Sequence, residues 1–274
     1  NTNIELTNTT ITDKIYVGSD TAVIKGDANL VVNGGSIKGI YGSYGTAAAQ
    51  GVVSGNLNVL LKDATVENVY LAGKGNALLE GKATLTLTGN TSISGRVSAG
   101  GLESGGYTPE IKGDSLLAFG NATDAYTGTI AATIEGFDKI EISNATTNVV
   151  FEKVFDVPVL QVATDAKVSL ANGTDFEKLI LSFDSDFSQG DTSSVDLETI
   201  FDSSTSIVLS ALQNETGASL TVKDSSGQEW SLASKDFTDN TLSFVVGSQV
   251  PEPATVAAIF GAVALALAVY RRRK

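Results

Sequence analysis

The chain has 274 residues, no cysteine, no histidine and a formal net charge of −13. Zero cysteine excludes a disulfide framework, and the lack of both residues removes most transition-metal ligands and most nucleophile–base pairs. The segment from Pro251 onward holds one acid and four bases, so residues 1–250 carry a charge of −16. This acidity argues against nucleic acid as a partner, because phosphates attract Lys and Arg.

The N-terminal part repeats a short alternation of polar and apolar residues that ends in a Gly-rich turn. The four copies are 10–20, 36–45, 65–75 and 92–101, with apolar anchors Ile11, Ile37, Val66 and Ile93. The anchors lie 26, 29 and 27 residues apart. Alternation with a period of two predicts strands, and this repeat length is too short for a propeller blade of about 40 residues. The sequence therefore predicts an all-β chain folded as a parallel β-solenoid (β-helix).

Two inward rows of apolar side chains follow from this alignment. The first is the anchor row itself. The second is predicted to contain Val31, Val59 and Leu87. A slip of one residue in the strand register would expose either row to solvent.

Tyrosines recur at the same place in successive copies. Tyr16, Tyr41 and Tyr70 each follow an apolar residue, and Tyr44 lies close to them in sequence. They are expected on the face opposite the core. Two interpretations stay open: a tyrosine ladder that supports the stack, or a strip on which carbohydrate rings bind.

These repeats resemble the β-helical passenger regions of bacterial autotransporter-like surface proteins. The resemblance covers residues 1 to about 145. It implies an elongated domain at the cell surface. The C-terminal β-barrel of that family has no counterpart in the tail, so its secretion route is not implied.

Further along the chain the pattern degenerates and then changes. Phe137, Ile140 and Ile142 are expected to face inward in a further coil, which places the solenoid at residues 1–183. Longer polar loops begin at residue 184, and residues 184–249 are predicted to form a β-rich cap with a linker. A solenoid needs such a cap because its open end is an unpaired sheet edge. Within it, Val195, Leu197 and Ile200 fit one face of a short helix.

One acidic loop is a candidate site for a bound cation. Asp184, Asp186 and Asp191 form an Asp-x-Asp-x4-Asp pattern, and oxygen-rich loops can bind Ca²⁺. The pattern lacks the Gly and Glu of an EF-hand, and a solvated acidic turn is the alternative. Apart from calcium, no cofactor is predicted.

Catalytic carboxylate pairs are the other candidates. Asp138 with Glu141, or Asp63 with Glu67, could approach on one face as in glycoside hydrolysis. With 31 acids in the chain such pairs arise by chance, and Arg96 is the only arginine before the tail. We therefore predict no catalytic, cofactor-binding or metal residues. An enzyme or binding protein that acts on polysaccharide remains the alternative.

The tail, residues 250–274, has three parts in order. They are the motif Pro251, Glu252 and Pro253, the apolar run Ala254–Tyr270, and the basic end Arg271, Arg272, Arg273 and Lys274. At about 1.5 Å per residue the apolar run would make a helix of roughly 25 Å, enough for a short transmembrane helix. The basic end predicts a cytoplasmic C-terminus and an exported N-terminal part.

This order closely resembles the PEP-CTERM sorting signal of exported proteins in Gram-negative bacteria. The resemblance covers the tail only. It implies an exosortase-type membrane protease as partner, removal of the helix, and delivery from the inner membrane to the cell surface or extracellular matrix. A permanent C-terminal anchor is the alternative.

Together these features predict an exported structural or adhesive protein, with exopolysaccharide or other surface proteins as further partners. Export also requires an N-terminal signal, which the polar start NTNIELTNTT does not provide. We therefore expect that such a signal precedes residue 1 in the precursor.

Overall fold

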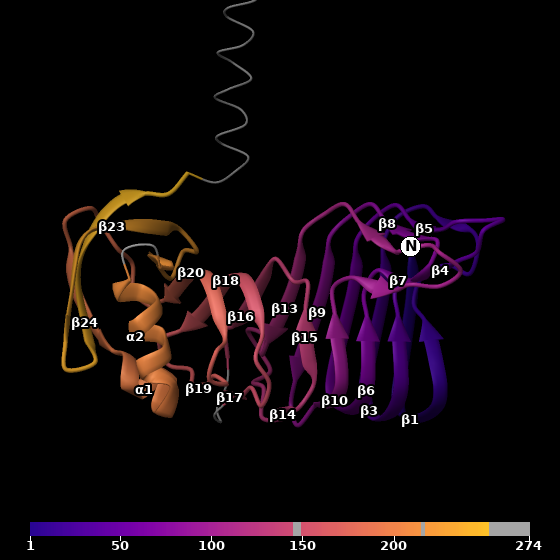
Figure 1. The fold of residues 1–274 in the computed structure, drawn as a ribbon, viewed down its shortest axis with the longest axis horizontal. Helices are drawn as coiled ribbons and strands as arrows, with labels where there is room; N and C mark the ends of the chain where they lie inside the picture. Colours follow the sequence, from indigo (N-terminus) through magenta and orange to yellow (C-terminus); the bar gives the residue numbers. More distant parts are fainter. Residues whose placement is uncertain (145–148, 215–216, 252–274) are drawn as a thin grey trace, which may run out of the picture.

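The computed structural model describes residues 1–144, 149–214 and 217–251. These residues form a mostly β fold around one large and mostly parallel sheet. In Figure 1 its strands stand side by side along the long axis, from β1 at one end to the helices, β23 and β24 at the other. The expectation of a mainly β chain with parallel strands is confirmed.

The parallel part of the large sheet follows the chain order. Its successive strands are β1 (Thr2–Tyr16), β3 (Ala28–Tyr41), β6 (Leu57–Tyr70), β9 (Ala83–Thr88), β13 (Ser115–Phe119), β16 (Lys139–Ile142), β18 (Asp156–Ala163), β20 (Asp175–Ser182) and β22 (Ser219–Lys223). A branch runs from β6 through β10 (Ser92–Ser98) to β14 (Thr129–Ile130) and β15 (Thr133–Glu135), also parallel.

Three smaller sheets run beside the large one, and their pairings are parallel as well. The first contains β4 (Tyr44–Gly45), β7 (Gly73–Gly75) and β11 (Gly101–Leu102). The second contains β2 (Val23–Ile24), β5 (Gly51–Val53), β8 (Ala77–Leu79) and β12 (Glu110–Ile111). The third contains β17 (Val149–Val150) and β19 (Val168–Ser169).

The register of the large sheet confirms the predicted anchor row. Ile11 pairs with Ile37, Ile37 with Val66, and Val66 with Ile93. The last three are buried, whereas Ile11 is half-buried on the edge strand β1. Each strand therefore places its apolar anchor beside that of the neighbouring strand.

The predicted second row is wrong. Val31 is only half-buried and pairs with Leu60, not with Val59. The buried rows on this part of the sheet are instead Leu30, Val59 and Leu85, and Val32, Leu61 and Leu87. Val31 and Leu60 are apolar although they face outward, so alternation alone does not fix the face of these strands.

One glycine shows how closely neighbouring strands of the small sheets approach. Gly73, the first residue of β7, has a φ of +100°, which L side chains rarely adopt. A Cβ atom at this position would lie 2.0 Å from the carbonyl oxygen of Ser43, which directly precedes the neighbouring strand β4. Only glycine allows the two backbones to meet here.

Aromatic side chains pack together in the core near the middle of the large sheet. Phe119 and Tyr126 are fully buried, with ring centroids 5.1 Å apart and rings edge to face. Phe151 lies 5.3 Å from Phe119 on the other side. Phe137, Ile140 and Ile142 are buried as predicted.

The far end of the molecule has a different architecture. It contains β21 (Thr192–Asp196), α1 (Leu197–Phe201), a 3-10 turn (Asp202–Ser204), α2 (Thr205–Gln213), β23 (Glu229–Thr238) and β24 (Thr241–Gln249). The pairings of β23 with β22 and β24, and of β24 with β21, are antiparallel. The cap was predicted to be rich in strands, and it contains two α-helices as well. Its boundary at residue 184 stays a prediction.

The short helix within this end was predicted in part. Leu197 and Ile200 are buried on α1, as expected, but Val195 belongs to strand β21. The helix begins after Asp196, whose side chain accepts a hydrogen bond of 2.9 Å from the Glu198 N–H. This cap satisfies a free N–H of the first turn and ends the strand there.

None of the helices in residues 1–144, 149–214 and 217–251 combines the length and apolarity needed to cross a bilayer. The run for which a transmembrane helix was predicted, 254–270, lies outside these residues.

Candidate functional site

The exit of the chain from the fold is the first candidate site, because the predicted sorting motif begins there. After β24, the Val250 N–H donates a hydrogen bond of 2.8 Å to the carbonyl oxygen of Glu229. The Gln228 side-chain amide donates to the Val250 carbonyl at 3.3 Å. Pro251 follows and is exposed. The motif thus starts at an exposed residue, directly after Val250, which is bonded to β23 and to the turn before it.

The rest of the predicted signal is outside the structural description. Of the predicted tail residues, the structure places only Pro251. Glu252, Pro253 and the basic end Arg271, Arg272, Arg273 and Lys274 lie outside the described residues.

Two of the three aspartates of the candidate calcium loop accept hydrogen bonds from different partners, and Asp184 lines an open pocket. The Asp191 carboxylate accepts a 2.7 Å hydrogen bond from the Ser188 N–H and so closes a turn. Asp186 accepts a hydrogen bond from the Ser225 hydroxyl. In the part of the chain that the structure describes, no three acids, histidines or cysteines are grouped to hold a metal ion.

The candidate catalytic carboxylates are likewise engaged by structural partners. Asp138 accepts hydrogen bonds of 2.7 Å from both the N–H and the hydroxyl of Ser115, and Glu141 pairs with Lys139 at 2.7 Å. Asp63 accepts a 2.8 Å bond from the Asn90 N–H one coil later. Glu67, the fourth, accepts a 3.1 Å bond from the Asn68 side chain.

The tyrosines form the predicted ladder. Tyr16 pairs with Tyr41 and Tyr41 with Tyr70 in the strand register. Their ring centroids are 5.5 and 5.1 Å apart, and Tyr44 lies 5.5 Å from Tyr16. The rings of Tyr41 and Tyr70 are stacked, whereas Tyr16 is tilted against Tyr41 and Tyr44. Tyr70 is only 9% exposed and offers little ring surface to a ligand, and the other three are half-buried.

The ladder also changes the chemistry of its phenols. Burial, followed by the neighbouring Tyr41 and Tyr44, raises the pKa of Tyr16 to about 12. Burial and then Tyr70 raise the pKa of Tyr41. The Tyr16 hydroxyl therefore stays protonated well into the alkaline range.

We expect the melting temperature to fall as the pH rises from about 10 to about 12. An unfolded tyrosine ionises near pH 10, whereas Tyr16 in the folded chain holds its proton to about 12. The stabilisation is thus complete below the unfolded pKa and is lost as the pH rises through the folded one. Tyr16→Phe should flatten this fall, and the exposed Tyr107→Phe should not. Equal profiles for both variants would contradict the assignment.

A second ladder was missed in the sequence. The side-chain amide of Asn58 donates to that of Asn29, and Asn29 donates to Asn3, each at 2.8 Å. The signal was available, because the alignment places these three asparagines at one position of the repeat. This ladder links the neighbouring strands β1, β3 and β6 on the outer face of the large sheet.

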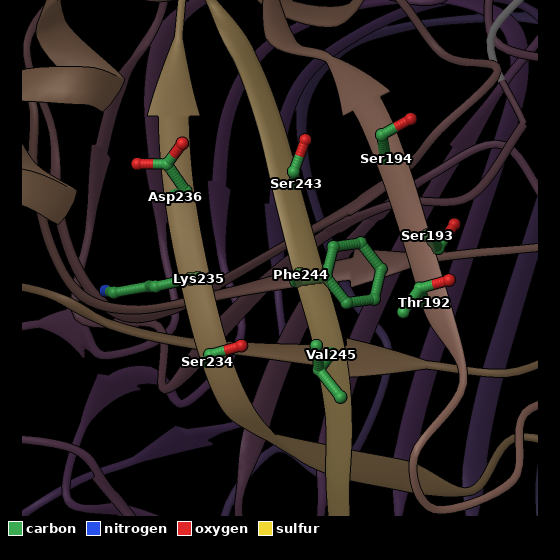
Figure 2. A pocket seen from close by; sticks show the side chains of 9 residues that line it. All are labelled: Thr192, Ser193, Ser194, Ser234, Lys235, Asp236, Ser243, Phe244 and Val245. Atoms are coloured by element: carbon green, nitrogen blue, oxygen red, sulfur yellow. The ribbon is translucent and has the colours of Figure 1, made fainter.

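An open cavity of about 480 Å³ lies over the antiparallel end sheet (Figure 2). Strands β21, β23 and β24 line it with hydroxyl side chains, among them Thr192, Ser194 and Ser243. Asp236 is its only carboxylate and Lys235 its only amine. Lys235 bonds the Leu212 carbonyl at 3.3 Å, so its amine is engaged outside the cavity lining.

Comparison with known proteins identifies the tail. Residues 249–274 match the PEP-CTERM protein-sorting motif. This motif points to an exported protein that is sorted to the cell surface, and signals of this type are processed by exosortase. No curated protein and no solved structure matches the chain. The predicted sorting signal is therefore confirmed as a motif, with the exit geometry described above.

Proposed function

We propose that this chain is a structural or adhesive protein of the cell surface or extracellular matrix, built as a β-solenoid. The observation that carries the proposal is the sorting motif at residues 249–274. The motif points to the cell surface as the destination. The parallel β fold that precedes the motif would be the part of the chain that is delivered there.

The common step of the sheets supports the solenoid. Thr2 pairs with Ala28 in the large sheet, a step of 26 residues. In two smaller sheets Val23 pairs with Val52 and Tyr44 with Lys74, steps of 29 and 30 residues. When different sheets advance by about one repeat together, the chain winds as a coil that stacks on itself.

The side-chain ladders favour a structural role over a binding strip. Stacked tyrosines and bonded asparagines stabilise neighbouring coils without disulfides or metals. The charge of −16 on residues 1–250 suits a solvated extracellular surface. An elongated and acidic protein of this kind would act as a spacer or adhesive element among matrix components, including exopolysaccharide and other surface proteins.

We further propose that the chain acts without catalysis. The support is that the candidate carboxylates each accept from, or pair with, a separate structural partner, as described above. Incubation of the full chain with acidic and neutral polysaccharides should release no reducing ends and no unsaturated sugars. Release that is lost on Asp138→Asn would establish the enzymatic alternative instead.

For the tail we propose a temporary membrane helix over Ala254–Tyr270, with its C-terminus in the cytoplasm. Its support is the apolar run followed by four basic residues. An exosortase-type protease would then remove this helix and release the chain from the inner membrane.

The adhesive role is tested in the native cell. Cells that lack the protein should attach more weakly to surfaces or to one another, and the full chain should restore attachment. A variant with Pro251, Glu252 and Pro253 replaced by alanine should not restore it. Normal attachment without the protein would overturn the adhesive role while leaving the sorting motif in place.

A further inference from the structure

The chain contains two Asn-Gly pairs, Asn33–Gly34 and Asn172–Gly173. Asparagine is a thermolabile residue, and a following glycine favours the loss of its side-chain ammonia. Glycine does so because it has no side chain to keep its backbone nitrogen away from the amide carbon. The sequence does not distinguish the two pairs, but the structure places them in opposite environments.

The pair Asn33–Gly34 is held inside the large sheet. It lies in the middle of β3, where Asn33 pairs with Thr7 of β1 on one side and with Lys62 of β6 on the other. Gly34 is buried. The backbone nitrogen of Gly34 therefore cannot turn toward the Asn33 amide without breaking the pairing of these strands.

The pair Asn172–Gly173 lies in the turn that joins β19 to β20. A hydrogen bond of 3.1 Å from the Thr174 N–H to the Ala171 carbonyl closes this turn, so that Asn172 and Gly173 are its two central residues. Both are exposed. Gly173 has a φ of +94°, a positive value that glycine adopts without steric cost.

The reacting groups of this turn are unoccupied and have room to move. Within the described ranges, neither the side-chain amide of Asn172 nor the N–H of Gly173 makes a hydrogen bond. A Cβ atom added at Gly173 would contact only the Val154 side chain, at 3.8 Å. Val154 is itself exposed. The turn can therefore rotate so that the Gly173 nitrogen meets the amide carbon.

We propose that Asn172 is a site of spontaneous deamidation. The Gly173 nitrogen forms a bond to Cγ of Asn172, the bond from Cγ to the side-chain nitrogen breaks, and that nitrogen leaves as ammonia with the proton of the Gly173 amide. Water then opens the cyclic imide at one of its two carbonyls. The product has aspartate or isoaspartate at position 172, and water is the only co-reactant.

The reaction adds a negative charge to a chain whose residues 1–250 already carry −16. In the isoaspartate form the backbone of the turn is longer by one atom. Because the turn is exposed and its surroundings are open, the strands on either side should stay folded. The site is independent of the adhesive role proposed above.

The test follows both pairs in one sample of the full chain. Trypsin, which cleaves after lysine, releases peptides 26–38 and 168–178, and each contains one Asn-Gly pair. After the folded chain is kept at mildly alkaline pH, mass spectrometry should show the mass gain of one deamidation in 168–178. The same gain should appear about tenfold or more slowly in 26–38, because a backbone within a sheet opens only at a free-energy cost.

Two controls separate the structure from the sequence. In denaturant both peptides should gain mass at similar rates. Asn172→Gln keeps the amide and the charge but lengthens the side chain, so it should abolish the gain in 168–178 and leave that in 26–38 unchanged. The proposal is overturned if 168–178 gains no mass in the folded chain, or if 26–38 gains it there as fast.

Discussion

Replacing Phe119 by alanine is expected to destabilise the centre of the stack by about 3–5 kcal/mol. Phe119 is fully buried, pairs with Leu87 and Ile142 in the strand register, and meets the rings of Tyr126 and Phe151. Removal of the Phe119 ring deletes apolar contacts and leaves a cavity. The neighbouring side chains cannot fill it, because they are held in hydrogen-bonded strands on both sides.

The effect should be local, because β13, which carries Phe119, pairs with β9 on one side and β16 on the other. Hydrogen exchange of the full chain should therefore show reduced protection in β9, β13 and β16 first. Leu116→Ala is the matched control, since Leu116 lies on the same strand but is only half-buried. If both variants lose the same stability, Phe119 is not the core residue described here.

A third substitution in this cluster separates packing from polarity. The Tyr126 hydroxyl is buried and has no hydrogen-bond partner in the described residues, and burial raises its pKa. Tyr126→Phe retains the ring and removes the unpaired group. It should leave stability unchanged or raise it, by at most about 1–3 kcal/mol.

Replacing Pro251, Glu252 and Pro253 together by alanine is expected to abolish processing of the tail. The motif begins at an exposed residue, after the Val250 N–H has made its bond to β23. The substitution should therefore leave the melting temperature unchanged while the chain accumulates in its longer form on immunoblots.

Ser243→Ala serves as the control for this experiment. Ser243 is exposed on β24 and lies outside the matched segment, so its processing should be normal. Normal processing of the triple variant would show that the motif is not what the cell recognises.

The parts of the fold that repeat were the parts that could be predicted. Ile11, Ile37, Val66 and Ile93 recur at a regular spacing, and the parallel strands pair them in register. The tyrosine ladder follows from the same alignment. Where an apolar residue such as Val31 lies on the outer face, both faces of the strand carry apolar side chains. The sequence pattern then does not indicate which face is buried, and the predicted second row was wrong for this reason.

The cap resisted prediction for a different reason. Strand β21 pairs with β24 across a long insertion that contains two helices, and nothing in a local pattern specifies that partner.

The central claim is that the tail is a sorting signal which the cell removes. Mass spectrometry of the mature C-terminus, in cells with and without the exosortase-type protease, tests it most directly. We predict a C-terminus that lacks Arg271–Lys274 when the protease is present and retains them when it is absent. An intact C-terminus in both strains would contradict the claim and leave a permanent anchor.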